Sequence, residues 1–311
     1  MAFNLATALD DVRYAEIVRL GVSTNVYVVG PPDELLLIDA GTDEAAAELI
    51  ETLEAAGCEP DAVRAIIITH GHNGHYGGAR ALVEWSGAPV WAHVAAAMQI
   101  EDPSGDFRDP AAIWDNATQE GLDGFRERVG GPVRVDRLLR EGDTVEHAGL
   151  TFDVLHTPGH ERGLITLFEP ERRLAFVGDL PQGGLDNSGN WLGLFHDVAV
   201  QRRSLRRVIE LDPAWEFRGH RAPHHGDDVG ANLACCVARL DEIESALLET
   251  LEQRSPLSDA EAARAAFRAL FDIEVARPRG YAITTVRAFF IDLAGRGRVR
   301  QTDDLEWELA Q

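Results

Sequence analysis

Residues Val63 to Gly78 read VRAIIITHGHNGHYGG, a run of apolar residues joined directly to three closely spaced histidines. The continuous apolar run Val63 to Ile68 is typical of a β-strand that is buried on both faces. His70 and His72 follow that strand in the loop where α/β proteins place their ligands, and His75 comes three residues later at an expected helix start. Neutral imidazole nitrogens in a tight turn can converge on one cation such as Zn²⁺. The segment predicts a metal site, although a histidine-rich surface loop is the competing explanation.

Three further segments place a His or an Asp directly after an expected strand. They are HTPGHERG (His156 to Gly163), FVGDL (Phe176 to Leu180) and FRGHRAP (Phe217 to Pro223). Each contains a glycine that lets the backbone approach closely. Because four strand ends in this order carry metal-binding residue types, a shared site explains them better than chance does.

The chain up to about residue 230 alternates between expected strands and helices. We predict strands at 25–29, 35–41, 63–68 and 89–93, helices at about 43–56, 78–85 and 200–210, short strands between 134 and 177, and a strand that ends at His220. The stretch 102–131 contains Gly, Pro and isolated aromatic residues without a clean period. We interpret it as a partly helical excursion over the site.

This ordered set resembles the metallo-β-lactamase superfamily, which includes glyoxalase II-like thioesterases and lactonases. The resemblance runs from about Asn25 to Pro223 and includes LLLIDAGT, whose Asp39 would support the metal loop from behind. It implies an α/β fold, a four-layer αββα sandwich with the site at the edge between its two sheets.

The resemblance also implies roles for individual residues. His70, His72 and His160 would form a first metal site, Asp179 would bridge, and His75 with His220 would belong to a second. The expected cofactor is one or two divalent cations, Zn²⁺ first, with Fe or Mn as alternatives. His70, His72, His75 and Asp179 would be the catalytic set, acting through a water molecule that the metal acidifies.

One departure from the family pattern bears on the second site. The family loop usually reads His-x-His-x-Asp-His, and this chain has Gly74 where the Asp is expected. Either the second site is weak and one metal suffices, or two histidines and one carboxylate still hold a second metal. Nearby residues that could take the place of the missing ligand are Asn73, His224, His225, Asp227 and Asp228.

Other polar and aromatic residues lie near these motifs in the sequence. We expect His156 to pack or to orient a ligand rather than to bind metal, and His93, His147 and His196 to be structural or exposed. Three aromatic residues are expected near the mouth of the site, where they would either line an apolar acyl pocket or pack the edge of the core. They are Tyr76, Trp191 and Phe195.

The C-terminal part has a different composition. We divide the chain into a catalytic domain, residues 1–230, and a small domain, residues 231–311, that reads as a long amphipathic helix, two further helices and a short hairpin. That order is winged-helix-like. Because the segment also carries many Asp and Glu residues, we expect it to serve packing, dimerisation or pocket closure rather than nucleic-acid binding.

Charge and composition narrow the functional classes. The formal net charge is -23, and all 29 basic residues are arginines. Such a field repels phosphate backbones and anionic membranes, so neither nucleic acid nor membrane is an expected partner. No stretch approaches the ~20 apolar residues of a membrane span and no cationic leader begins the sequence, so we expect a cytoplasmic protein. The three cysteines form no disulfide framework.

The functional hypothesis is hydrolysis of an ester, thioester or lactone in a small-molecule or acyl-carrier substrate, by a monomer or a homodimer. An iron-dependent, oxygen-using oxidoreductase on the same scaffold is the first alternative. A degenerate member that only binds ligands is the second, and the six candidate metal ligands argue against it.

Overall fold

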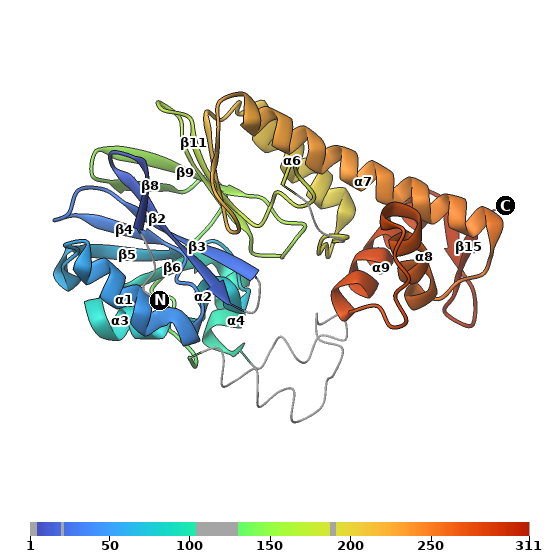
Figure 1. The fold of residues 1–311 in the computed structure, drawn as a ribbon, viewed down its shortest axis with the longest axis horizontal. Helices are drawn as coiled ribbons and strands as arrows, with labels where there is room; N and C mark the ends of the chain where they lie inside the picture. The colour runs from blue at the N-terminus through green and yellow to red at the C-terminus, as the bar shows by residue number, and fades with distance from the viewer. Residues whose placement is uncertain (1–4, 20–21, 104–129, 187–190, 311) are drawn as a thin grey trace.

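The computed structural model describes residues 5–19, 22–103, 130–186 and 191–310, and two β-sheets lie in the left half of Figure 1, opposite the C-terminal helices. The first sheet has seven strands in sequence order, β1 (Leu5–Leu9), β2 (Val12–Arg19), β3 (Val22–Val29), β4 (Leu35–Ile38), β5 (Val63–Ile68), β6 (Val90–His93) and β7 (Arg137–Leu139). The second runs in the order β13 (His224–His225), β12 (Trp215–Arg218), β11 (Leu174–Gly178), β10 (Ile165–Glu169), β9 (Leu150–His156) and β8 (Thr144–His147).

Strand alternation decides which residues lie between the sheets. On β4, Leu36 and Ile38 belong to the hydrophobic cluster between the sheets, whereas Leu35 and Leu37 belong to the cluster on the outer face. The inner cluster contains three aromatic rings at its centre: Tyr27 meets Phe176 and Phe217 edge-on, with ring centroids 5.3 and 5.4 Å apart. The sheets therefore share one apolar layer and expose their other faces to helices.

Helices cover the outer face of each sheet. On the first sheet they are α1 (Asp43–Ala55), α3 (Ala79–Ser86) and α4 (Val94–Glu101), with the single turn α2 (Asn73–Tyr76) and the 3₁₀ turn η1 (Pro60–Ala62) beside them. On the second sheet they are α6 (Val198–Glu210) and α7 (Asp227–Gln253). The layers therefore run α, β, β, α, and the predicted fold class is confirmed.

The C-terminal helices extend the same hydrophobic cluster that covers the second sheet. α8 (Asp259–Phe271) packs beside α7, and α9 (Gly280–Gly295) packs against α8 and α6 (Figure 1). A hairpin of β14 (Val299–Gln301) and β15 (Trp307–Leu309) follows α9. Buried residues from the sheet, such as Ala175, and from α9, such as Phe289, belong to one cluster. The order of helix, helix and hairpin is the expected one, while the domain boundary and the winged-helix interpretation stay predictions.

The structure adds elements that the sequence patterns did not indicate. β1 and β2 form an N-terminal hairpin, and α4 follows β6 directly. Most of the predicted excursion over the site, residues 104–129, lies outside the described residues. Among the described helices, none has both the length and the apolar character that a membrane crossing requires.

Candidate metal centre

Four ligand atoms from three strand ends converge at one edge of the sandwich. His72 Nδ1 lies 3.1 Å from His70 Nε2 and 2.9 Å from His160 Nε2. Asp179 Oδ2 lies 3.7 Å from His70 Nε2 and 3.4 Å from His160 Nε2. Ligands held ~2.1 Å from a tetrahedral zinc ion stand about 3.4 Å apart, so these spacings fit such an ion. We call His70, His72, His160 and Asp179 the first group.

Hydrogen bonds on the outer side fix the tautomers of two of these imidazoles. Thr69 Oγ1 donates to Asp39 Oδ2 at 3.0 Å and so accepts a proton from His70 Nδ1 at 3.1 Å. His160 Nδ1 donates to the carbonyl of Leu194 at 2.9 Å. The inner Nε2 atoms of His70 and His160 therefore carry lone pairs. Without a metal, a proton on His72 Nδ1 can be shared with these two atoms; with its proton on Nε2 instead, His72 completes a set of three imidazole nitrogens that fits a metal.

A second group shares Asp179. His220 Nε2 lies 2.9 Å from Asp179 Oδ2, and His75 Nε2 lies 3.4 Å from Asp179 Oδ1. His220 donates its outer proton to the carbonyl of Ser23, and His75 donates its own to Asp39 Oδ2 at 2.8 Å. Asp179 Oδ1 is buried and makes no hydrogen bond shorter than its 3.4 Å contact with His75 Nε2, so a cation that displaces the proton of His75 could use this atom.

The electrostatics of the two groups differ. Burial lowers the pKa of His70 and of His72 well below the usual value. Burial also lowers the pKa of His160, to about 4, although the charge of Asp179 raises it in part. These three side chains are therefore neutral near pH 7, as metal ligation requires. Burial also acts on His75, but the charges of Asp179 and Asp39 outweigh it and raise the pKa to about 10. Without a metal, His75 carries a proton between two carboxylates.

Asp39 connects the two groups from the end of β4. Its Oδ1 accepts from the Thr69 backbone at 2.8 Å, and its Oδ2 serves both Thr69 Oγ1 and His75. The side chain is almost fully buried, and its backbone φ of 63° lies in the left-handed region that few non-glycine residues occupy. Asp39 therefore orients one ligand of each group.

Two glycines shape the second group in opposite ways. A Cβ atom at Gly219 would come within 2.1 Å of Asp179 Oδ1, so only glycine fits between β12 and His220. A Cβ atom at Gly74 would meet only Thr24 Oγ1, at 3.4 Å. A side chain at position 74 could therefore begin without a clash with the backbone.

The loop that carries His220 is fixed by two residues of β3. Asn25 donates from Nδ2 to the carbonyl of Arg218 at 2.9 Å, and Tyr27 donates from its hydroxyl to the same carbonyl at 2.6 Å. Burial raises the pKa of Tyr27 well above its usual value, so the hydroxyl stays protonated and remains a donor. This contact joins the first sheet to the second beside the site.

Of the three aromatic residues expected near the mouth of the site, two are buried and one lies near the surface. Tyr76 and Phe195 are buried in hydrophobic clusters, and Phe195 packs edge-on against Phe289. Trp191 is about one third exposed, and its ring centroid lies 4.1 Å from that of Tyr281. Of the three aromatic residues, Trp191 therefore remains near the surface, whereas the other two serve packing.

The remaining predicted histidines have structural partners. His156 belongs to neither metal group; it bonds to the carbonyl of Arg162 at 2.8 Å and stacks on His93 with ring centroids 4.1 Å apart. His147 bonds to the carbonyls of Val29 and Glu34, both at 3.1 Å. These side chains therefore have partners within the protein, and their expected structural roles stay predictions.

The possible substitute ligands lie elsewhere. His224 contacts Asp186 at 3.4 Å and His225 packs on Trp215, while Asp227 and Asp228 begin α7. Neither metal group includes any of the four candidates from this segment. Asn73 is the first residue of α2, directly after His72, and is partly exposed.

Gln182 and His196 border the centre, although sequence patterns gave them no role there. Gln182 lies 3.0 Å from His160 Nδ1 and accepts from the backbone of Leu194 at 2.7 Å. His196 is close enough for its charge to contribute to the lowered pKa of His160, after burial. The only sequence signal for Gln182 was its position three residues after Asp179 in a glycine-rich loop.

Fold and donor set together define a class of protein, an αββα sandwich with a His and Asp cluster able to hold a divalent metal at the sheet edge. Residues 19–220, well over half of the chain, match the family described as the metallo-beta-lactamase superfamily. The chain therefore belongs to the metallo-β-lactamase superfamily.

Individual relatives agree with this assignment. The chain is 32% identical over 202 residues to the acyl-coenzyme A thioesterase MBLAC2 of Gallus gallus, covering 61% of this chain and 68% of that one. It is 30% identical over 156 residues to the hydroxyacylglutathione hydrolase GloC of Haemophilus influenzae, covering 48% of this chain and 62% of that one.

Solved structures extend the likeness of fold to nearly the whole chain. A metallo-beta-lactamase family protein from Thermus thermophilus has a TM-score of 0.77 at 22% identity and covers 97% of this chain and 100% of its own. A beta-lactamase domain protein from Burkholderia ambifaria has a TM-score of 0.75 at 19% identity and covers 98% and 93%. The C-terminal helices therefore belong to a fold that other members share.

Proposed function

We propose that this chain is a metal-dependent hydrolase of an ester, thioester or lactone, with acyl thioesters as the first substrates to test. The observation that carries the proposal is the convergence of three imidazole nitrogens and one carboxylate oxygen in the first group, where the contacts measure 2.9 to 3.7 Å. Membership of the superfamily and likeness to an acyl-coenzyme A thioesterase and a hydroxyacylglutathione hydrolase support the choice of bond.

The protein supplies the metal ligands, holds them in position and leaves one side of the site open to solvent. When bound, a divalent cation provides a Lewis acid that polarises an acyl carbonyl and acidifies a water molecule. The buried His70, His160 and Asp179 hold the inner side of the site. His72 and His220 are partly exposed, so the site opens to solvent on their side. This is the side from which a substrate carbonyl would approach.

Metal removal and reloading test the proposal. Protein stripped with a chelator should lose turnover of a panel of acyl thioesters and lactones, and Zn²⁺, Mn²⁺ or Fe²⁺ should restore it. Thermal unfolding followed in parallel separates loss of metal from loss of fold. A folded, metal-loaded protein that cleaves no member of the panel would refute the hydrolase proposal.

An oxygen-using iron enzyme is the second candidate. It is favoured by one feature, the second group, in which two histidines and one carboxylate, His75, His220 and Asp179, form a donor set that suits Fe(II). Purified protein with stoichiometric iron that consumes oxygen during turnover would favour this candidate over hydrolysis.

A further inference from the structure

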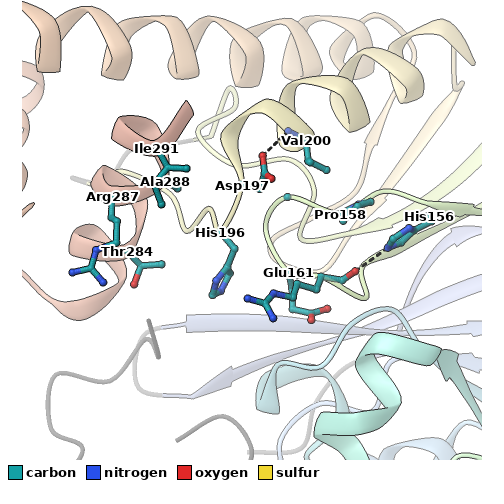
Figure 2. A pocket seen from close by; sticks show the side chains of 12 residues that line it. His156, Pro158, Glu161, His196, Asp197, Val200, Thr284, Arg287, Ala288 and Ile291 are labelled. Carbon is teal, nitrogen blue, oxygen red and sulfur yellow. Dashed lines mark hydrogen bonds between the residues drawn. The ribbon is translucent and has the colours of Figure 1, made fainter. Parts of the chain in front are cut away.

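A pocket of about 400 Å³ lies between the loop that carries His160 and the C-terminal helix α9 (Figure 2). One wall is loop 156–162, the other is a face of α9, and residues near the start of α6 close the end. Figure 2 shows the His196 side chain projecting between Thr284 on one wall and Glu161 on the other. We call this space the α9 pocket.

The α9 pocket adjoins the first metal group. Gly159 and Glu161 both line it, and His160 stands between them in the chain. The carbonyl of Leu194 accepts from His160, and His196, two residues later, lines the pocket. None of the six candidate ligands lines the pocket itself, but His196 lies close enough to His72 and His160 for its charge to act on both, so the pocket lies beside the first metal group.

Polar side chains around the pocket already have protein partners. Asp197 accepts from the backbone of Val200 at 2.9 Å, and Glu161 accepts from the backbone of Gly163 at 2.7 Å. Arg287 donates to Asp259 at 2.7 Å. Because these groups are committed within the protein, they favour no particular polar ligand.

The apolar side chains that line the pocket come from three elements of the fold. Pro158 comes from the loop, Val200 from α6, and Ala288 and Ile291 from α9, so apolar side chains lie on both walls and at the end of the pocket. Ile291 is 59% exposed at this position, so its side chain is accessible to a molecule in the pocket. Apolar surface gathered from three elements is suited to an apolar ligand.

Both walls are fixed before any ligand binds. Ser204 of α6 donates to the carbonyl of Pro158 at 2.7 Å, which holds the loop. Thr285 of α9 donates to the carbonyl of Gly193 at 2.9 Å and accepts from the backbone of Phe195 at 3.1 Å, which holds α9 against the segment beside His196. The pocket is therefore preformed.

We propose that the α9 pocket binds the apolar acyl chain of the substrate, and that α9 limits the length of the acyl chain that fits. The inference rests on the proposed function for the bond that is cleaved, while the binding of an apolar chain stands on the pocket alone. Each methylene that enters an apolar site should raise kcat/KM by about three- to fourfold until the pocket is full.

Chain-length profiles test the proposal. Thioesters of one small thiol, from acetyl to dodecanoyl, are assayed with metal-loaded wild type and with Ala288→Trp, which adds a large side chain to the α9 wall. We expect the rise in kcat/KM to stop at a shorter chain in the variant than in wild type. A flat profile in wild type, or the same profile in both proteins, would overturn the proposal.

An exposed position provides a variant that leaves the buried core intact. Ile291→Ser should lower kcat/KM for the long chains by at least about threefold. Ile209→Ser is the matched control, because Ile209 is 39% exposed on α6 and does not line the pocket. Equal effects of the two substitutions would contradict a pocket role for Ile291.

Direct binding distinguishes this proposal from the proposed function. Calorimetry with 1-hexanol, 1-octanol and 1-decanol uses chains that have no carboxylate to bind the metal. Affinity should rise with chain length in wild type and in Ile209→Ser. At each chain length, the affinity of Ile291→Ser should be lower than that of wild type. If the alcohols bind in this way but no thioester is cleaved, the hydrolase proposal fails and the pocket stands. If thioesters are cleaved without dependence on chain length or on these variants, the pocket proposal fails and the hydrolase stands.

Discussion

The two metal groups share Asp179 but are prepared differently for a cation. In the first, burial keeps three imidazoles neutral, and the inner nitrogen of His72 lies 2.9 and 3.1 Å from those of the other two. In the second, Asp179 and Asp39 hold a proton on His75, whose pKa is raised to about 10. His220 is partly exposed, and Gly74 supplies no carboxylate. A proton thus occupies the second group, whereas the three imidazoles of the first group are neutral, as metal ligation requires.

This difference implies unequal metal affinity within one centre. A ligand set of neutral nitrogens binds without releasing a proton from its imidazoles, while His75 must lose one. We therefore expect the first group to fill first. Substitutions that weaken one group and spare the other test this order.

The largest effect is expected from removing one partly exposed histidine of each group. His72→Ala should lower kcat/KM by about 10³-fold or more, because the first group loses a ligand and with it several kcal/mol of charge stabilisation. His220→Ala, the matched change in the second group, should cost far less. Thioester kinetics with metal analysis of both variants measure the difference, and a larger loss in His220→Ala would reverse our ranking.

Asp39→Asn should weaken both groups through their orientation. An asparagine oxygen can still accept from Thr69, but its amide nitrogen cannot accept the proton of His75, so metal affinity should fall about 10- to 100-fold, more at the second group. Competition titration with a chromogenic chelator measures both affinities. Thr69→Ser keeps the hydroxyl and is the control; unchanged affinities in Asp39→Asn would show that Asp39 does not orient the ligands.

Gly74→Asp should strengthen the second group alone. The position lies in the helical turn α2 and has an open side, so a carboxylate can be added without strain. We expect the second metal to bind about tenfold more tightly, by analogy with the affinity changes that supporting carboxylates cause. Gly74→Asn matches the size without the charge and should gain much less. Equal gains in both variants would indicate packing rather than ligation.

The smallest effect concerns the stability of the chelator-treated protein. The lowered pKa values of His70, His72 and His160 mean that the unfolded chain binds more protons below pH ~6.5, so this part of the stability falls as pH drops toward 4. The raised pKa of His75 has the opposite sign, because its contribution is complete below pH ~6.5 and is lost as pH rises through about 10.

The Tm of the metal-free protein should therefore be highest near pH ~6.5 and lower by about 2–4 °C per kcal/mol lost on either side. Calorimetric scans between about pH 5 and pH 9, which bracket the ordinary histidine pKa, measure this profile. The substitution His75→Gln should remove the alkaline decline and keep the acidic one. A variant that retains the full alkaline decline would exclude His75 as its cause.

Local patterns predicted those parts of the fold that depend on continuous burial. The apolar run predicted at 63–68 has the same bounds as β5, and α1 differs from its prediction by one residue at its end. The β1–β2 hairpin escaped prediction because β1 is only partly buried at a sheet edge, which leaves a weak alternation. α4 escaped because its apolar residues continue those of β6 without a break.

The candidate ligands could be found from residue type and position after a strand, and the structure brings all six into the two groups. The direction in which the neighbouring side chains point could not be predicted in this way. Tyr76 and Phe195 lie close to ligands in the sequence or the fold, but long-range packing buries both in the cores. Gln182 reaches His160 only because of the path of its loop, which no local pattern records.

Anomalous diffraction from crystals grown without added metal tests the central claim most directly, that the first group holds a cation. We predict a peak within about 2.0–2.1 Å of the inner nitrogens of His70, His72 and His160, with weaker or no density beside His75 and His220. A well-ordered centre without a peak among those three nitrogens, or with its strongest peak at the second group, would contradict that claim.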